Sequence, residues 1–175
     1  TTLPVAAFAT ADTLLCQNDC INFSNASLNA TTYQWTFSGA QTVSSTLQYP
    51  VNICYGNSGT FDVQLIACNT IGCDTLTFTA YIKVDSLPQI NLGSDTLICN
   101  GDSILLDAGA GFDSYLWSNN STQQSIVVST QGNYFVSINS GACSVSDSIF
   151  ISTQPCNVPV ISLSSSDTLF CEKQC

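Results

Sequence analysis

Ten cysteines are the residues of this 175-residue sequence whose type and spacing could do chemistry. Three residues separate Cys16 from Cys20, and Cys171 and Cys175 repeat that Cys-x3-Cys spacing. Thiolates placed in this way can bind a metal ion or form a redox pair. The spacing is not Cys-x2-Cys, however, the sequence contains no histidine, and the only cation beside either pair is Lys173. We therefore expect structural disulfides, and neither zinc nor redox chemistry.

Expected strand positions narrow the pairing of the cysteines, although sequence alone does not fix it. Cys68 and Cys73 flank a four-residue hairpin connection and could face each other across it. Cys99 precedes an early strand and Cys143 starts a last strand, so this pair could staple one sandwich.

Two further pairings stay open at this point. Cys54 is expected to meet Cys20 or Cys16, because early and middle strands are neighbours in sandwiches, and the other member of that pair is left over. Cys156 lies in a linker and is the candidate for a bond across domains or subunits, for example to Cys171.

A repeated pentapeptide sets the domain organisation. The sequence Asp-Thr-Leu-x-Cys occurs at 12–16, 95–99 and 167–171, and each copy follows a proline. Repeats of this kind indicate tandem units. The expected domains are a first sandwich over residues 1–86, a second over 87–155, and a linker with the first strand of a further repeat over 156–175.

The fold class predicted from the pattern of apolar residues is all-β. Apolar side chains recur at a period of two, and no convincing helical period is present. Tyr33, Trp35 and Phe37 alternate on one strand face, and Trp117 has the equivalent place in the second unit. Short strands separated by turn residues predict two tandem antiparallel β-sandwiches, with both tryptophans in their cores. The expected strands cover residues 20–23, 33–37, 51–55, 61–67, 76–84, 103–106, 115–117, 132–138 and 145–152.

Two family resemblances rest on these residues. Residues 4–84 resemble a PKD domain, through Tyr33-x-Trp35-x-Phe37-x-Gly39 and Gly59-x-Phe61-x-Val63-x-Leu65 among other positions. Residues 88–155 resemble the Ig-like repeats of large secreted surface proteins of Bacteroidota-type bacteria, through Leu92-Gly93-x-Asp95-Thr96 and Tyr115-x-Trp117-Ser118. The resemblance implies a long adhesin or an extracellular scaffold.

Aspartates followed by Ser or Thr and an aliphatic residue occur seven times, and two interpretations stay open. Such aspartates suit turns and strand starts because their side chains bond to nearby backbone. The same tripeptide is also similar to the O-glycosylation signal of the bacterial group just named. That resemblance would place sugars on Thr13, Thr75, Ser86, Thr96, Ser103, Ser148 and Thr168.

Composition excludes several classes of function. A net charge of −10 makes nucleic acid an unsuitable partner, and no apolar run reaches the length of a membrane span. Without histidine, arginine or a paired-carboxylate motif, we expect no catalysis. No cofactor is expected, and the only candidate for calcium is Asp85 with an acidic loop at the domain junction. Many cysteines favour an oxidising location, at the cell surface or outside the cell.

The function predicted from these observations is a non-enzymatic structural or adhesive module of an extracellular protein or fibre. The alternative is a carbohydrate-binding module, which would require several exposed rings among Tyr49, Tyr55, Tyr81 and Phe112. Expected partners are neighbouring domains or subunits, joined by strand addition through residues 158–175, together with glycans.

Overall fold

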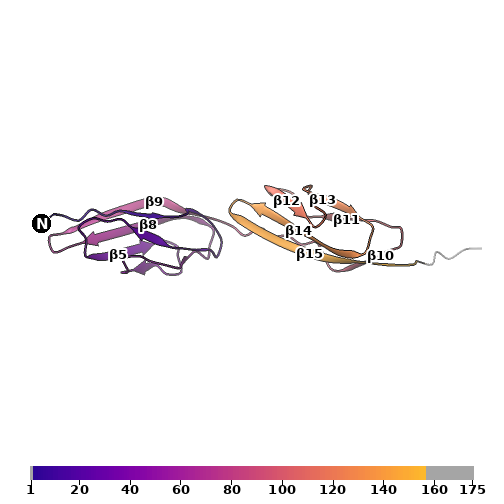
Figure 1. Ribbon diagram of the computed structural model, residues 1–175, viewed down its shortest axis with the longest axis horizontal. Coiled ribbons are helices and arrows are strands. Elements are labelled where there is room, and N and C mark those ends of the chain that lie inside the picture. Colours follow the sequence, from indigo (N-terminus) through magenta and orange to yellow (C-terminus); the bar gives the residue numbers. More distant parts are fainter. Residues whose placement is uncertain (1, 157–175) are drawn as a thin grey trace, which may run out of the picture.

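The computed structural model describes residues 2–156 and shows two β-sandwiches placed end to end (Figure 1). Strands β1–β9 form the first unit and β10–β15 form the second. This architecture confirms the all-β fold class and the tandem sandwiches. The third repeat, including the proposed strand over 158–175 and the candidates Thr168, Cys171 and Cys175, lies outside the described residues.

The first unit packs a five-stranded sheet against two short ladders. The sheet has the order β2-β9-β8-β5-β6, and the ladders are β1-β4 and β3-β7. All of these pairs are antiparallel except β2 with β9, which run parallel. The bounds are β1 Phe8–Thr10, β2 Leu14–Cys16, β3 Cys20–Ile21, β4 Phe23–Asn25, β5 Thr32–Phe37, β6 Ser44–Ser45, β7 Ile53–Cys54, β8 Gly59–Cys68 and β9 Cys73–Asp85.

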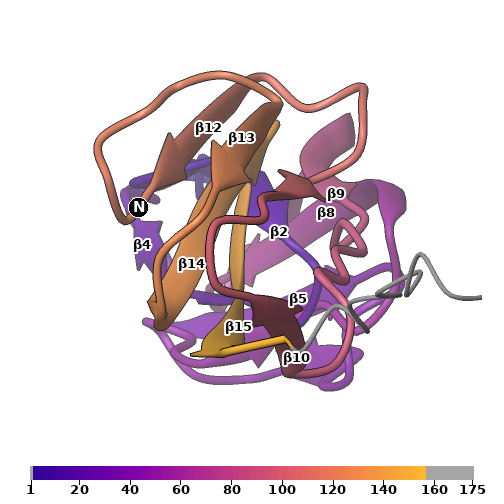
Figure 2. The ribbon, with the colours of Figure 1, turned by 90° about the vertical axis from the view of Figure 1, so that its right-hand side faces the viewer.

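The second unit repeats this plan with fewer strands. A four-stranded sheet has the order β10-β15-β14-β12 and faces the ladder β11-β13. Figure 2 shows this unit from its outer end, with β10 beside β15, again the one parallel pair. The bounds are β10 Thr96–Cys99, β11 Ile104–Asp107, β12 Ser114–Trp117, β13 Ser125–Val128, β14 Gly132–Ser140 and β15 Cys143–Gln154.

Both cores are built around the predicted tryptophans. Trp35 and Trp117 are 0% and 1% exposed, and each lies in a strand next to the long central hairpin of its unit. Each indole N–H donates to a backbone carbonyl in a loop further along the chain, that of Leu47 at 2.9 Å and that of Gln123 at 2.8 Å. A buried indole needs such an acceptor. The prediction that both tryptophans are core residues is therefore confirmed.

Aspartates of the repeated tripeptide fasten the entry segment of each unit to its last strand. The Asp74 carboxylate on β9 accepts from the backbone N–H of Ala6 at 2.8 Å, and Asp147 on β15 accepts from that of Leu92 at 2.7 Å. Asp95 likewise accepts from the N–H of Phe150 at 2.9 Å. These three bonds join residues that are distant in sequence, whereas the expected bond to nearby backbone is seen at Asp12, which accepts from the N–H of Leu14 at 3.0 Å.

The structure departs from the expected strands in several places. The expected strand over 20–23 is divided into β3 and β4, and the expected ranges did not include β1, β2, β6, β10 and β13. Where the first unit has β6 and β7, the second has β13 alone, in a shorter stretch of chain between its tryptophan strand and its central hairpin. No helix among residues 2–156 is long and apolar enough to cross a membrane.

Candidate functional site at the domain junction

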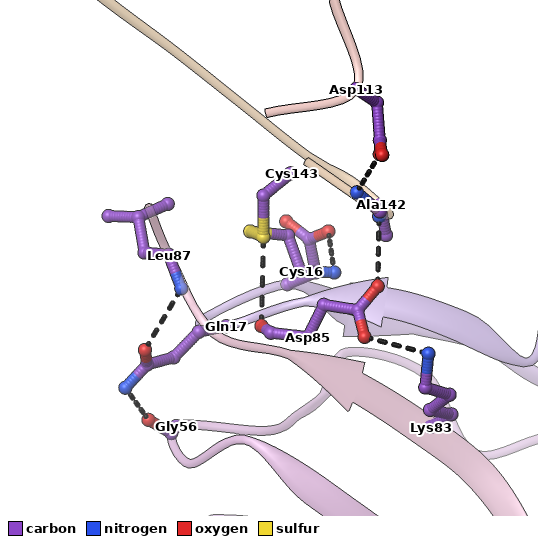
Figure 3. Close-up of a disulfide and its surroundings, with 11 residues drawn as sticks. Cys16, Gln17, Gly56, Lys83, Asp85, Leu87, Asp113, Ala142 and Cys143 are labelled. Carbon is purple, nitrogen blue, oxygen red and sulfur yellow. Dashed lines mark hydrogen bonds and ion pairs between the residues drawn. A yellow bond between two sulfur atoms is a disulfide. The ribbon is translucent and has the colours of Figure 1, made fainter. Parts of the chain in front are cut away.

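The junction between the units is formed by two strand ends and one hairpin. Because β2 runs parallel to the end of β9, Cys16 lies opposite Asp85, the last residue of that strand. The β14–β15 hairpin of the second unit, where Ser140 pairs with Cys143, turns back toward these strand ends (Figure 3). Strand ends of the first unit and a hairpin of the second therefore meet at this junction.

A disulfide joins the two units at this point. Cys16 is bonded to Cys143, with Cα atoms 4.9 Å apart and a sequence separation of 127. The two residues are only 7% and 1% exposed. The Sγ atom of Cys143 also lies 3.6 Å from the backbone carbonyl oxygen of Asp85. Because both cysteines are buried, reductants reach the bond more slowly than an exposed disulfide.

The Asp85 carboxylate adds a polar contact across the junction. One oxygen accepts from the backbone N–H of Ala142 at 3.0 Å, and the other lies 3.0 Å from the Lys83 Nζ (Figure 3). The Ala142 bond, aided by the bond and charge of Lys83, lowers the pKa of Asp85 from its usual range. The carboxylate consequently stays ionised and bonded to the second unit at neutral pH.

Gly141 allows the hairpin to approach Asp85 closely. Its φ is +57°, a conformation that L side chains rarely adopt, and a Cβ placed there would overlap the Asp85 carboxylate. Its N–H donates to the Asp113 side chain at 2.7 Å, which holds the turn from the second unit's own side. The tip of the hairpin is thus shaped to fit the end of β9.

Gln17 connects the first unit to the linker. Its backbone N–H donates to the Asp85 carbonyl at 2.9 Å, and its side-chain amide donates to the Gly56 carbonyl at 2.8 Å. Its side-chain oxygen accepts from the N–H of Leu87, at 3.4 Å. Gln17 was not singled out from the sequence. The sequence feature that could have identified it is its position directly after the repeated pentapeptide, where strand β2 ends.

The structure joins the other described cysteines within units. Cys68 is bonded to Cys73 across the hairpin, as expected, and Cys54 is bonded to Cys20, one of its two expected partners. Cys16, left over by that choice, is the residue that crosses the junction.

The expected pair of Cys99 with Cys143 is wrong, and so is that of Cys156 with Cys171, because Cys99 is bonded to Cys156. Cys99 lies opposite Gln154 near the end of β15, whereas Cys143 starts the same strand. Gln154 lies eleven residues beyond Cys143 along β15, which places Cys99 roughly 36 Å from Cys143. A disulfide needs Cα atoms within about 7 Å. The expected pair placed both cysteines at one end of the unit.

Asp85 does not resemble a calcium ligand in this arrangement, since both of its oxygens are engaged by an N–H and an ammonium group. Among residues 2–156, no three acidic, cysteine or histidine side chains gather as metal ligands would.

The four rings named for carbohydrate binding do not form an exposed row. Tyr49 is 54% exposed, whereas Tyr55 is fully buried. Tyr81 and Phe112 are half-buried and pack against the cores of different units.

Most described candidates for O-glycosylation lie on the surface. Thr96 is half-buried, and its hydroxyl donates to the Ser94 carbonyl at 2.8 Å. The exposed candidates are Thr13, Thr75, Ser86, Ser103 and Ser148.

Comparisons with known proteins agree with the fold. Residues 6–82 match the family model of the PKD domain, so the first unit has the resemblance expected of residues 4–84. No match to the chain was found among curated proteins.

Among solved structures, extracellular domains 3–5 of Drosophila OTK are similar with a TM-score of 0.52 and 11% identity. That match covers 86% of this chain and 62% of the OTK chain. An I-band fragment of titin is 12% identical with a TM-score of 0.44, over 89% of this chain and 67% of that chain. The OTK likeness shows the fold alone, β-sandwiches in tandem.

Proposed function

We propose that this protein is a non-enzymatic structural module, a stiff spacer, in an extracellular cell-surface protein or fibre. The observation that carries this proposal is the disulfide between Cys16 and Cys143, which joins the two units beside the Asp85–Ala142 bond. Domains joined only by a linker generally move relative to each other. A covalent bond and a hydrogen bond next to a short linker restrict that motion.

Several features support an extracellular setting. Within residues 2–156, all eight cysteines are joined in four disulfides, and disulfides persist mainly in oxidising compartments. PKD and Ig-like domains are generally non-catalytic modules, and the first of these families matches residues 6–82. The resemblance of residues 88–155 to surface repeats of Bacteroidota-type bacteria supports placing the module on such a surface, where it would link neighbouring domains or subunits.

O-linked glycans are part of this proposal. Only 8% of the residues are charged, so hydroxyls and amides must keep the surface hydrated. Sugars on the exposed Asp-Ser/Thr sites would add to that hydration and would cover exposed strand edges. Intact mass of the protein purified from its source checks this: added hexose masses are expected, and the mass of the bare polypeptide would contradict glycosylation.

The spacer role is tested by location and by stiffness. An antibody against the folded protein should label intact source cells, and labelling only after permeabilisation would contradict the cell-surface role. Small-angle X-ray scattering of the full chain should give one elongated particle. The Cys16→Ser, Cys143→Ser double variant should give a broader distribution of dimensions, whereas Cys68→Ser, Cys73→Ser should leave them unchanged. Equal breadth in all three proteins would contradict the stiffness.

A further inference from the structure

The junction disulfide makes most of the chain a side loop. A pull between the two chain ends follows the shortest covalent route, which runs along residues 1–16, across the bond to Cys143, and on along 143–175. Residues 17–142 hang from the two cysteines and carry no tension. They include β3–β14, and therefore most strands of both sandwiches.

The part of this route in the second unit is already extended. From Cys143 to Gln154 it is one uninterrupted strand, β15. A strand rises about 3.3 Å per residue, and a fully stretched chain reaches only about 3.3–3.6 Å per residue. Figure 1 shows β15 running from the junction to the outer end of this unit. The second unit therefore has almost no slack along this route.

The part in the first unit is also largely extended. It contains the bridge of Val5 to Leu28, strand β1 and strand β2, with a bend between the two strands. In Figure 1 it runs from the end of the first unit marked N to the junction. The route thus passes through both units as two extended segments joined by one buried disulfide.

We propose that the protein is an inextensible covalent tether: tension along its axis bypasses both cores, which stay folded under loads that unfold ordinary sandwiches. The sheets then serve to hold the two tension-bearing segments straight and to enclose the disulfide. This inference rests on the proposed spacer function for its biological use, but its physical basis is only the covalent connectivity.

Removing the junction bond changes the route in a defined way. The shortest path then crosses Cys20–Cys54, Cys68–Cys73 and Cys99–Cys156. The chain between Cys54 and Cys68 and between Cys73 and Cys99 enters the path, so β8 and β9 must be pulled out of their sheet before the chain is taut. That route is longer than the native one by roughly 110 Å at full extension.

Single-molecule force spectroscopy of the full chain, held by handles fused at both ends and kept free of reductant, tests this inference. The wild-type protein should stretch without unfolding steps from either sandwich. The Cys16→Ser, Cys143→Ser variant should unfold in steps that add roughly 110 Å of contour length. The Cys68→Ser, Cys73→Ser variant is the matched control and should behave as wild type, because that bond is not on the native route. Sandwich unfolding steps in the oxidised wild type, or equal contour lengths for the wild type and the junction variant, would overturn the tether.

Adding dithiothreitol to a wild-type molecule held under tension gives a second readout that needs no variant. Unfolding steps should then appear and end at the length of the complete 175-residue chain, and a wild type unchanged by full reduction would contradict the inference. The two proposals fail separately. Unfolding steps in a protein that is rigid and exposed on cells remove the tether and leave the spacer, whereas an inextensible protein found only inside cells removes the spacer.

Discussion

The central hairpins of the two units place cysteine at the start of their last strand and use it differently. In the first unit Cys73 is bonded to Cys68, its register partner across the hairpin. In the second unit the register partner of Cys143 is Ser140, and Cys143 is bonded to Cys16 of the other unit. One missing cysteine thus changes a local staple into a bond between domains.

This comparison shows that the location of a hairpin decides what its cysteine can do. The tip of the β14–β15 hairpin faces the end of β9, so Cys143 lies beside the end of a strand that belongs to the other unit (Figure 3). The local bond closes a short loop, whereas the junction bond closes a loop of more than one hundred residues. Loop length governs how strongly a cross-link restricts the unfolded chain.

The largest expected effect distinguishes the two bonds by their loops. Replacing Cys16 and Cys143 by serine should lower the free energy of unfolding by about 4–5 kcal/mol, while replacing Cys68 and Cys73 should lower it by about 2 kcal/mol. Guanidinium chloride unfolding of both double variants measures the difference. Equal losses would show that the junction bond does not restrict the unfolded chain as its loop length requires.

A smaller effect is expected from the glycine that lets the second hairpin reach Asp85. Gly141→Ala should destabilise the protein by about 2–3 kcal/mol, because the new Cβ overlaps the carboxylate and the backbone has positive φ. Gly111→Ala also has positive φ, but nothing lies within 4 Å of its Cβ, so a loss of about 1 kcal/mol is expected. Thermal unfolding of the two variants measures the difference, which is the contribution of the junction contact. Similar losses of stability in both variants would argue against that contact.

Asp85→Asn should weaken the junction less than Gly141→Ala, since an amide oxygen can still accept from Ala142. Because folding lowers the pKa of Asp85, its contribution is complete above the usual aspartate pKa of about 3.9 and is lost as the pH falls through the folded value. Denaturant midpoints between pH 7 and pH 2 should fall less steeply for Asp85→Asn than for wild type. Asp102→Asn, at an exposed aspartate, is the control for loss of a charge. If its denaturant midpoint depends on pH as that of Asp85→Asn does, Asp85 has no specific role at the junction.

The smallest effect compares two tyrosines. Among the described residues the Tyr55 hydroxyl is buried without a partner, whereas the Tyr115 hydroxyl donates to the Gly109 carbonyl at 2.9 Å. Tyr55→Phe should leave stability unchanged or raise it by about 1 kcal/mol, and Tyr115→Phe should lower it by about 1 kcal/mol. Urea unfolding at pH 7 decides the order of the two variants.

Tyr55 also predicts a dependence on alkaline pH. Burial raises its pKa to about 12, so the unfolded chain loses this proton first and wild-type stability should fall between about pH 10 and 12. Tyr55→Phe should lack that part of the fall. Parallel curves for both proteins would contradict the burial of an ionisable phenol.

The sequence predicted what depends on local periodicity. Alternating apolar residues located β5, β8, β9 and β14, and the hairpin between Cys68 and Cys73 indicated its own disulfide. The junction bond could not be found in this way. It depends on the parallel pairing that brings Cys16 to the end of β9, and on the second unit's orientation, which places Cys143 at that same point. Both are tertiary relationships: the first pairs Cys16 with Asp85, 69 positions later, and the second joins Cys16 to Cys143, 127 positions later.

The disulfide between Cys16 and Cys143 has a further consequence for proteolysis. The exposed residues Ser86 and Leu87 in the linker offer a protease a place to cut. In an ordinary tandem, one cut there would release the outer domain and whatever it carries. In this molecule a cut anywhere between the two cysteines leaves both fragments covalently attached, so the protein continues to join its two ends after its backbone is broken.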